Sequence, residues 1–144
     1  MRVLFVPPNN WATHPNPMRH HFLYKRLARR YRCEVYVVNF DGLGSSHTIL
    51  NRDLVLNDNI HLIGQYALPA SNPASYYTLN LGHIWSLISR ALAALDIEVV
   101  VHSNILPSAA VCTLAQRKKI PIVYDYADYY PQSSSAYFLS LIHI

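Results

Sequence analysis

Residues 95–128 read LDIEVVVHSNILPSAAVCTLAQRKKIPIVYDYAD, and this stretch decides the fold. Ile97–Val101 is apolar and β-branched except at Glu98, and this short run predicts a buried strand. Pro107 is suited to the first turn of a helix. The predicted helix Ser108–Lys119 ends in cations, which interact favourably with the helix dipole. A second apolar run, Ile122–Tyr124, follows. This order predicts a βαβ unit, in which the two strands are parallel and the crossover is right-handed.

The same alternation extends toward the amino terminus. Apolar or β-branched runs predict further strands at Val3–Val6, Cys33–Phe40 and Ile60–Tyr66. Amphipathic patterns predict helices over Met18–Arg32 and Tyr77–Leu95. Together these elements predict the α/β class, with a Rossmann-like parallel sheet and helices on both of its faces.

Apolar spacing also predicts which side of each helix is buried. For the first helix the expected core residues are Leu23, Leu27 and Tyr31, with Ala28 beside them. For the longer helix they are Leu81, Ile84, Trp85, Ile88, Leu92 and Leu95. Ligands of open parallel sheets bind beyond the carboxyl ends of the strands. Four segments are therefore candidates for a site: Pro7–Asn16, Asp41–Ser46, His102–Ser108 and Asp125–Pro131.

Composition excludes several classes of protein. The chain has 144 residues, of which 51% are hydrophobic and 14% charged, so a disordered chain or a coiled coil is not expected. No apolar run reaches the length of about 20 residues that a membrane-spanning helix needs. Cys33 and Cys112 lie in different predicted elements, which argues against a disulfide framework or a zinc site. The opening residues form a strand-like run with no signal-peptide pattern, which predicts a cytoplasmic protein.

The carboxyl-terminal residues differ from the rest. Leu139–Ile144 is what the nucleotides CTG-TCT-CTT-ATA-CAC-ATC encode, and these resemble a transposase sequencing adapter. We therefore expect residues 1–138 to be an incomplete N-terminal Rossmann-like domain and residues 139–144 to be an adapter scar. A genuine terminal strand is the alternative interpretation.

Sequence motifs leave few phosphate-binding options. The chain has no G-x-x-x-x-G-K-[ST] run, which excludes a P-loop. Gly42-Leu43-Gly44 follows the second predicted strand and lacks the third glycine of a dinucleotide fingerprint. His14, His20 and His21 do not form a metal-binding set, because adjacent helical residues point about 100° apart. We predict no metal and no cofactor.

Two groups of polar residues follow predicted strands. His102 directly follows Val99–Val101, so it can position a hydroxyl or stabilise charge at the ligand edge, or it can be a hydrogen-bonded, half-buried histidine. Asp125 and Asp128 follow the last strand, where they can bind polyol hydroxyls or simply cap a loop.

The first helix has a basic face. Six cations fall within an arc of roughly 160°, which also contains Phe22. These cations are Arg19, Lys25, Arg26, Arg29, Arg30 and Arg32. The pattern fits a helix that rests on an anionic membrane surface, and it also fits an ordinary solvated face. The tyrosines form no stacking platform, so a nucleic-acid partner is not expected.

Four segments carry a resemblance to a known family. They are Met1–Pro8, Asn16–His21, Asp96–Ser108 and Pro121–Pro131. In order and spacing they resemble the N-terminal, acceptor-side domain of GT-B glycosyltransferases of family 4. The resemblance implies that His102 lies beside the reacting sugar.

Further site residues follow from the same resemblance. Asn104, Asp125 and Asp128 match positions that face the interdomain cleft, and Asn9 and Asn10 stand in the loop after the first strand. We expect these five residues to contact substrate. The family loop is usually glycine-rich, whereas here it carries prolines and asparagines.

The resemblance implies a retaining transferase that moves a sugar from a nucleotide-sugar donor to a glycan or lipid-linked acceptor. A C-terminal domain, which is not expected in this chain, holds the donor through a pair of glutamates in such enzymes. The chain alone is then expected to be inactive, in the cytoplasm or at the inner face of the membrane. The alternative is a non-catalytic Rossmann-like module that binds a nucleotide or phospho-ligand.

Overall fold

The computed structural model describes residues 1–8, 10–12, 19–40, 59–65, 68, 72–103 and 107–125. Five parallel strands form one sheet in the order β3-β2-β1-β4-β5. The strands are β1 (Arg2–Val6), β2 (Glu34–Phe40), β3 (Ile60–Gln65), β4 (Val99–His102) and β5 (Ile122–Tyr124). The helices are α1 (Arg19–Tyr31), α3 (Pro73–Leu79), α4 (Leu81–Ala94) and α5 (Ser108–Arg117). This architecture confirms the predicted Rossmann-like α/β fold.

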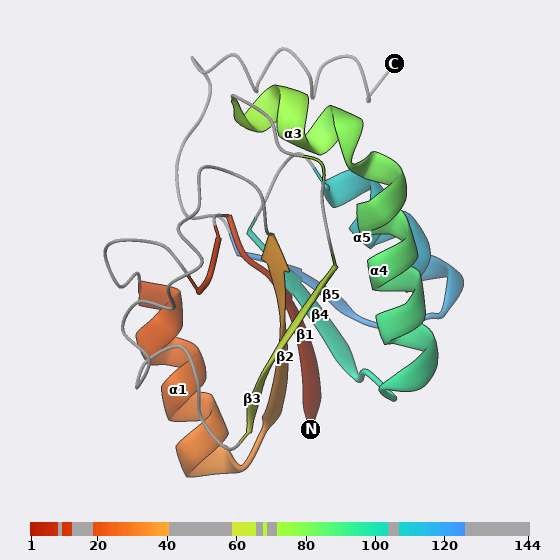
Figure 1. Cartoon of the computed structure of the whole chain (residues 1–144). Helices are drawn as coiled ribbons and strands as arrows, with labels where there is room; N and C mark the ends of the chain where they lie inside the picture. Colours follow the sequence, from red (N-terminus) through yellow and green to blue (C-terminus); the bar gives the residue numbers. More distant parts are fainter. Residues whose placement is uncertain are drawn as a thin grey trace.

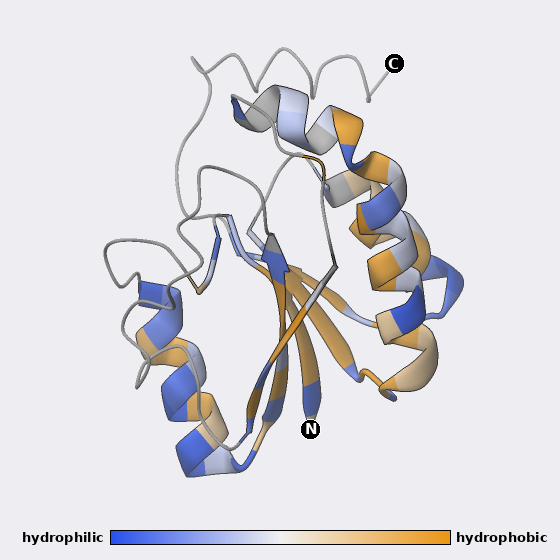
Figure 2. Ribbon diagram, viewed as in Figure 1, coloured by the Kyte–Doolittle hydropathy of each residue, from blue (hydrophilic) through white to orange (hydrophobic). Residues whose placement is uncertain are grey.

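Helices cover the sheet on both sides. Helix α1 lies on one face, and α3, α4 and α5 gather on the other side (Figure 1). Strand residues alternate between these faces, because successive side chains of a strand point in opposite directions. Leu4 and Val100 pack toward α4 and α5, whereas Val3 and Phe5 pack toward α1. The strands are hydrophobic over most of their length, as expected for a parallel sheet that is buried between layers (Figure 2).

The buried side of α1 differs from the prediction. Leu23 is 48% exposed and Tyr31 is 62% exposed, so the expected apolar stripe does not form the core contact. The buried residues are His20, His21, Tyr24 and Ala28. This side of the helix is selected by aromatic packing: the rings of Phe5 and Tyr24 lie 4.3 Å apart, centroid to centroid. Leu27 is partly buried beside this cluster.

The predicted helix Tyr77–Leu95 is two helices, α3 and α4, which meet at Asn80. The buried Asn80 side chain donates to the Leu68 carbonyl at 2.8 Å and accepts from the Leu68 amide at 2.7 Å. A side chain that bonds a distant backbone competes with helix continuation. Asn72 begins α3 by accepting from the Ser75 amide at 2.9 Å. In α4, the expected core residues Ile84, Ile88 and Leu92 are buried, whereas Leu81 is 50% exposed.

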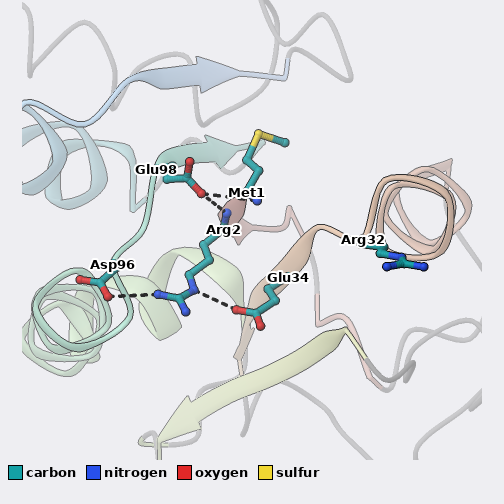
Figure 3. A pocket seen from close by; sticks show the side chains of 6 residues that line it. All are labelled: Met1, Arg2, Arg32, Glu34, Asp96 and Glu98. Carbon is teal, nitrogen blue, oxygen red and sulfur yellow. Dashed lines mark hydrogen bonds and ion pairs between the residues drawn. The ribbon is translucent and has the colours of Figure 1, made fainter.

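A charged cluster holds the amino ends of the strands together (Figure 3). The Arg2 guanidinium donates from Nε to Glu34 Oε2 at 2.9 Å and from Nη1 to Asp96 Oδ2 at 3.0 Å. Glu98 accepts from the Arg2 backbone amide at 2.6 Å. The Arg2 guanidinium lowers the pKa of Glu34. These groups are partly exposed, so the cluster aligns the strand ends and contributes little stability.

Candidate functional site

The strand order places a candidate site where β1 and β4 run side by side. The chain passes from β1 to β2 in one direction and from β4 to β5 in the other, so the strand order reverses between β1 and β4. Val6 and His102 are register partners at the carboxyl ends of these strands. The Ser103 amide donates to the Val6 carbonyl at 3.0 Å. In open α/β sheets such a reversal leaves a crevice in which ligands bind.

His102 is the last residue of β4 and is only 3% exposed. Its side chain lies on the α5 side of the sheet, where Cys112 Sγ is 3.8 Å from Nε2. Burial raises the pKa of the Cys112 thiol, so the thiol stays protonated and can donate to this nitrogen. The Tyr124 ring packs on the imidazole with a centroid distance of 4.8 Å. His102 thus lies at the carboxyl end of its strand, and Tyr124 covers its ring.

Asp125 gathers a second polar cluster on the α1 side. Arg19 Nη2 donates to Asp125 Oδ1 at 2.5 Å, and His20 Nε2 donates to Oδ2 at 2.6 Å. Ser103 Oγ lies 3.3 Å from the same nitrogen of His20. The cluster joins the first turn of α1 to the ends of β4 and β5. A carboxylate held this way has oxygen lone pairs available for hydroxyl groups of a polyol.

The imidazole of His20 is buried, with its side chain 3% exposed. Burial lowers the pKa of His20, and this effect exceeds the opposing effect of the Asp125 carboxylate. His20 is therefore neutral at pH 7, with its proton on Nε2 facing Asp125 and its lone pair on Nδ1. Within the part of the chain that the structure describes, Nδ1 is buried and has no hydrogen-bond partner. Burial also raises the pKa of the neighbouring Tyr24 hydroxyl.

The loop after β1 is held by its own side chains. Asn10 is buried, and its Oδ1 accepts from the Ala12 amide at 3.1 Å. Trp11 stacks on His21 with ring centroids 3.9 Å apart, and His21 Nε2 lies 2.9 Å from the Trp11 carbonyl oxygen. Asn10 thus stabilises the loop conformation from within the protein. The other residue expected to bind substrate from this loop, Asn9, lies outside the described residues.

The predicted site residues do not all meet. His102 and Asp125 are linked through the backbone, because the Asp125 amide donates to the His102 carbonyl at 2.9 Å. Their side chains, however, belong to clusters on opposite faces of the sheet. Asn104 and Asp128 fall outside the residues that the structure describes. His20 was not predicted as a site residue, and Ser103 was included only through the candidate segment His102–Ser108. Both contact the cluster at the carboxyl edge of the sheet.

The basic face predicted for the first helix is present on α1. Phe22 is 54% exposed. Of the cations, Lys25 is half-buried, and Arg19 is exposed but paired with Asp125. Arg26, Arg29 and Arg30 are exposed on the helix. Arg32 is exposed just beyond the end of α1, where its φ of 50° departs from the helical conformation. None of the helices in the described ranges is long and apolar enough to cross a membrane.

No metal centre is evident in the described part of the chain, where no three His, Cys, Asp or Glu side chains are grouped to hold an ion. Cys33 and Cys112 are both free thiols.

Comparison with solved structures identifies related folds. The glycosyltransferase of kitacinnamycin aligns with a TM-score of 0.57 at 15% identity, over 98% of this chain and 34% of that one. A UGT transferase from Siraitia grosvenorii, solved in complex with UDP, aligns with a TM-score of 0.53 at 13% identity, over 88% of this chain and 28% of that one. A deacetylase of teicoplanin biosynthesis aligns with a TM-score of 0.54 at 12% identity, over 88% of this chain and 65% of that one.

These likenesses show the fold alone, because all three identities are low. The chain spans about a third of the length of the two glycosyltransferases. No protein-family profile matches the chain. No curated protein matches it either. The chain thus has a Rossmann-like fold, which it shares with these two glycosyltransferases and with the deacetylase.

Proposed function

We propose that this chain is the N-terminal, acceptor-side part of a retaining glycosyltransferase of the family 4 type. In this proposal the complete enzyme moves a sugar from a nucleotide-sugar donor to a glycan or lipid-linked acceptor. The observation that carries the proposal is the position of His102, which ends β4 beside β1 where the strand order reverses. A histidine at this edge can contact the sugar that is transferred.

Each cluster has a role in the proposal. His102 is the catalytic residue, and Tyr124, which is 43% exposed, moves aside when the sugar binds. Asp125, held by Arg19 and His20, binds acceptor hydroxyls, together with Asn9, Asn10, Asn104 and Asp128. The basic face of α1 holds the enzyme at the inner surface of an anionic membrane. No metal takes part.

The donor is expected to be held by a second domain that this chain does not include. One matched transferase was solved in complex with UDP, which supports a nucleotide-sugar as co-substrate. That transferase is more than three times as long as its aligned region, which supports a second domain in the complete enzyme. Transfer requires the donor and acceptor to be positioned against each other. The chain alone is therefore expected to be inactive.

The alternative is a non-catalytic module that binds a nucleotide or phospho-ligand at the same edge of the sheet. Calorimetric titration of the 144-residue chain with UDP distinguishes the transferase fragment from the binding module. The proposal predicts a dissociation constant weaker than about 1 mM, because the donor site lies elsewhere. Micromolar binding by the chain would favour the module.

The source gene tests whether the reading frame continues beyond this chain. An unfragmented template read across codon 138 is expected to continue in frame into a second α/β domain with a Glu-x7-Glu motif. A stop codon directly after Ile144 would contradict the proposal and leave the binding module.

A further inference from the structure

An apolar groove of about 740 Å³ lies between α1 and the α1-side face of β4 and β5. Val99, Val101 and Val123 from the two strands line it, and Leu23 and Leu27 line it from the helix. Leu23 and Val123 are large apolar side chains that remain 48% and 49% exposed. Strands of a parallel sheet are normally covered on both faces, so this part of the sheet is unusual. The groove volume falls in the range of about 300 to 1,000 Å³ that small-molecule sites occupy.

Cations border the groove along α1. Arg19 lines its end at the carboxyl edge of the sheet, where Asp125 pairs with it. Arg26 and Arg30 follow Leu23 and Leu27 by three residues each, which places them on the adjacent strip of the helix surface. Both are exposed. Within the described part of the chain, no ion pair involves either of them.

The helix side of the groove carries only positive charge, because the sequence of α1, RHHFLYKRLARRY, contains no acidic residue. The acidic residue that lines the groove, Asp125, is paired with Arg19. An apolar groove bordered by cations complements a molecule that has a hydrocarbon chain and an anionic head. A second copy of this chain would instead bring its own cationic rim toward the same surface, and like charges repel.

We propose that the groove between α1 and β4–β5 binds a single-chain anionic lipid, with its hydrocarbon chain along Val101 and Val123 and its phosphate at Arg26 and Arg30. The proposal does not depend on sugar transfer. It also differs from attachment to a membrane surface, because the lipid enters the groove as a single molecule and contacts the sheet. Burial of the hydrocarbon chain against these valines supplies the favourable free energy of binding.

Dodecyl phosphate, kept below its micelle concentration, is a suitable probe for titration calorimetry with the whole chain. We expect saturable binding to one site. Val123→Glu should weaken binding at least about tenfold, because it places a carboxylate on the groove floor beside the hydrocarbon. The control is Leu81→Glu on α4, which changes a side chain of similar exposure, 50%, away from the groove and should leave binding unchanged.

A second pair of variants tests the rim. Arg30→Ala should weaken binding several-fold, whereas Arg29→Ala, which lies about 100° away on the same helix, should not. Circular dichroism melting verifies that each variant is folded. All four substitutions are at exposed positions, so the fold is expected to survive them.

Three outcomes would overturn the proposal. The first is no saturable binding of dodecyl phosphate to the folded wild-type chain. The second is equal binding by the Val123→Glu and Leu81→Glu variants. The third is binding only to anionic vesicles, with wild type and Val123→Glu bound equally, which would assign the lipid contact to the basic face of α1. If the first outcome is accompanied by concentration-dependent self-association that Val123→Glu abolishes, the groove is a protein interface.

Discussion

The two faces of the sheet are covered to different extents, and the difference separates the stable part of the molecule from the part available to ligands. On the α4–α5 face, Leu4, Val6, Val38 and Val100 are completely buried. On the α1 face, Val3 and Val35 are buried beneath α1, but Val123 is 49% exposed. The helix that follows β1 packs over β1, β2 and β3, whereas Val101 and Val123 line the groove beside it. Arg19 and Asp125 also line this groove, so it reaches the Asp125 cluster.

The largest expected difference is between two helix residues that face the sheet from opposite sides. Ile88 of α4 is completely buried, whereas Leu23 of α1 is 48% exposed. Ile88→Ala should lower the free energy of unfolding by about 2–5 kcal/mol, because it leaves a cavity. Leu23→Ala should lower it by less than about 1 kcal/mol, because water already reaches that side chain. Urea unfolding measures both. Equal losses would mean that the groove is filled in solution.

Adjacent residues of β4 give a sharper version of the same test. Val100 is completely buried on the α4–α5 face, and Val101 is half-buried toward the groove. Val100→Thr should cost about 1–3 kcal/mol of stability, because the added hydroxyl loses its water. Val101→Thr should cost less, since its hydroxyl can stay hydrated in the groove. Denaturant midpoints of the two variants compare them directly, and a larger loss for Val101→Thr would refute the difference between the faces.

The α1 face should add a pH dependence through His20. Burial lowers the pKa of His20 in the folded chain below its ordinary value of 6.5, so the unfolded chain binds more protons between the two values. Stability should therefore be fully present above pH 6.5 and should fall as the pH drops below it, by at most about 1.4 kcal/mol per pH unit. His20→Asn should flatten this slope.

Urea midpoints at several pH values between about 5 and 8 measure the effect. His83→Asn is the control, because His83 is exposed on α4. If His20→Asn kept the wild-type slope, the pH dependence would have another origin, and the lowered pKa of His20 would be contradicted.

The smallest expected effect concerns the end of α5 and does not depend on how either face of the sheet is covered. Lys119 has a φ of 56°, in the left-handed region that favours glycine. Lys119→Gly should raise stability by about 1 kcal/mol. The neighbouring Lys118 has a φ of −94°, so Lys118→Gly should give no such gain. Thermal melting of the two variants tests whether the gain comes from the backbone conformation at residue 119.

The strands could be predicted from the sequence because burial on both faces produces continuous apolar runs, as in Val3–Val6. The break between α3 and α4 could not be predicted from periodicity, which continues through it. The break depends on Asn80 bonding to Leu68, twelve residues away. The buried side of α1 was predicted only in part. Ala28 is buried and Leu27 packs beside the core as expected, but Leu23 is on the side next to the groove. His20 and His21, which were not predicted, make core contacts.

The candidate site was only partly predictable. A polar residue that follows an apolar strand is expected at the carboxyl end of that strand, and this rule placed His102 and Asp125 at the same edge of the sheet. The partner of Asp125, His20, is separated from it by 105 positions in the chain, and a single sequence contains no signal for that contact. The side of the sheet on which each residue lies follows from strand register, which only the folded structure provides.

The most direct test of the proposed function is release of nucleoside diphosphate from a panel of nucleotide-sugars by the protein expressed from the complete reading frame. We expect turnover with at least one donor and acceptor pair. We also expect His102→Ala to lower kcat by about 100-fold or more, while the KM for the donor changes little. An active enzyme whose kcat is unchanged by His102→Ala would contradict the role assigned to the edge between β1 and β4.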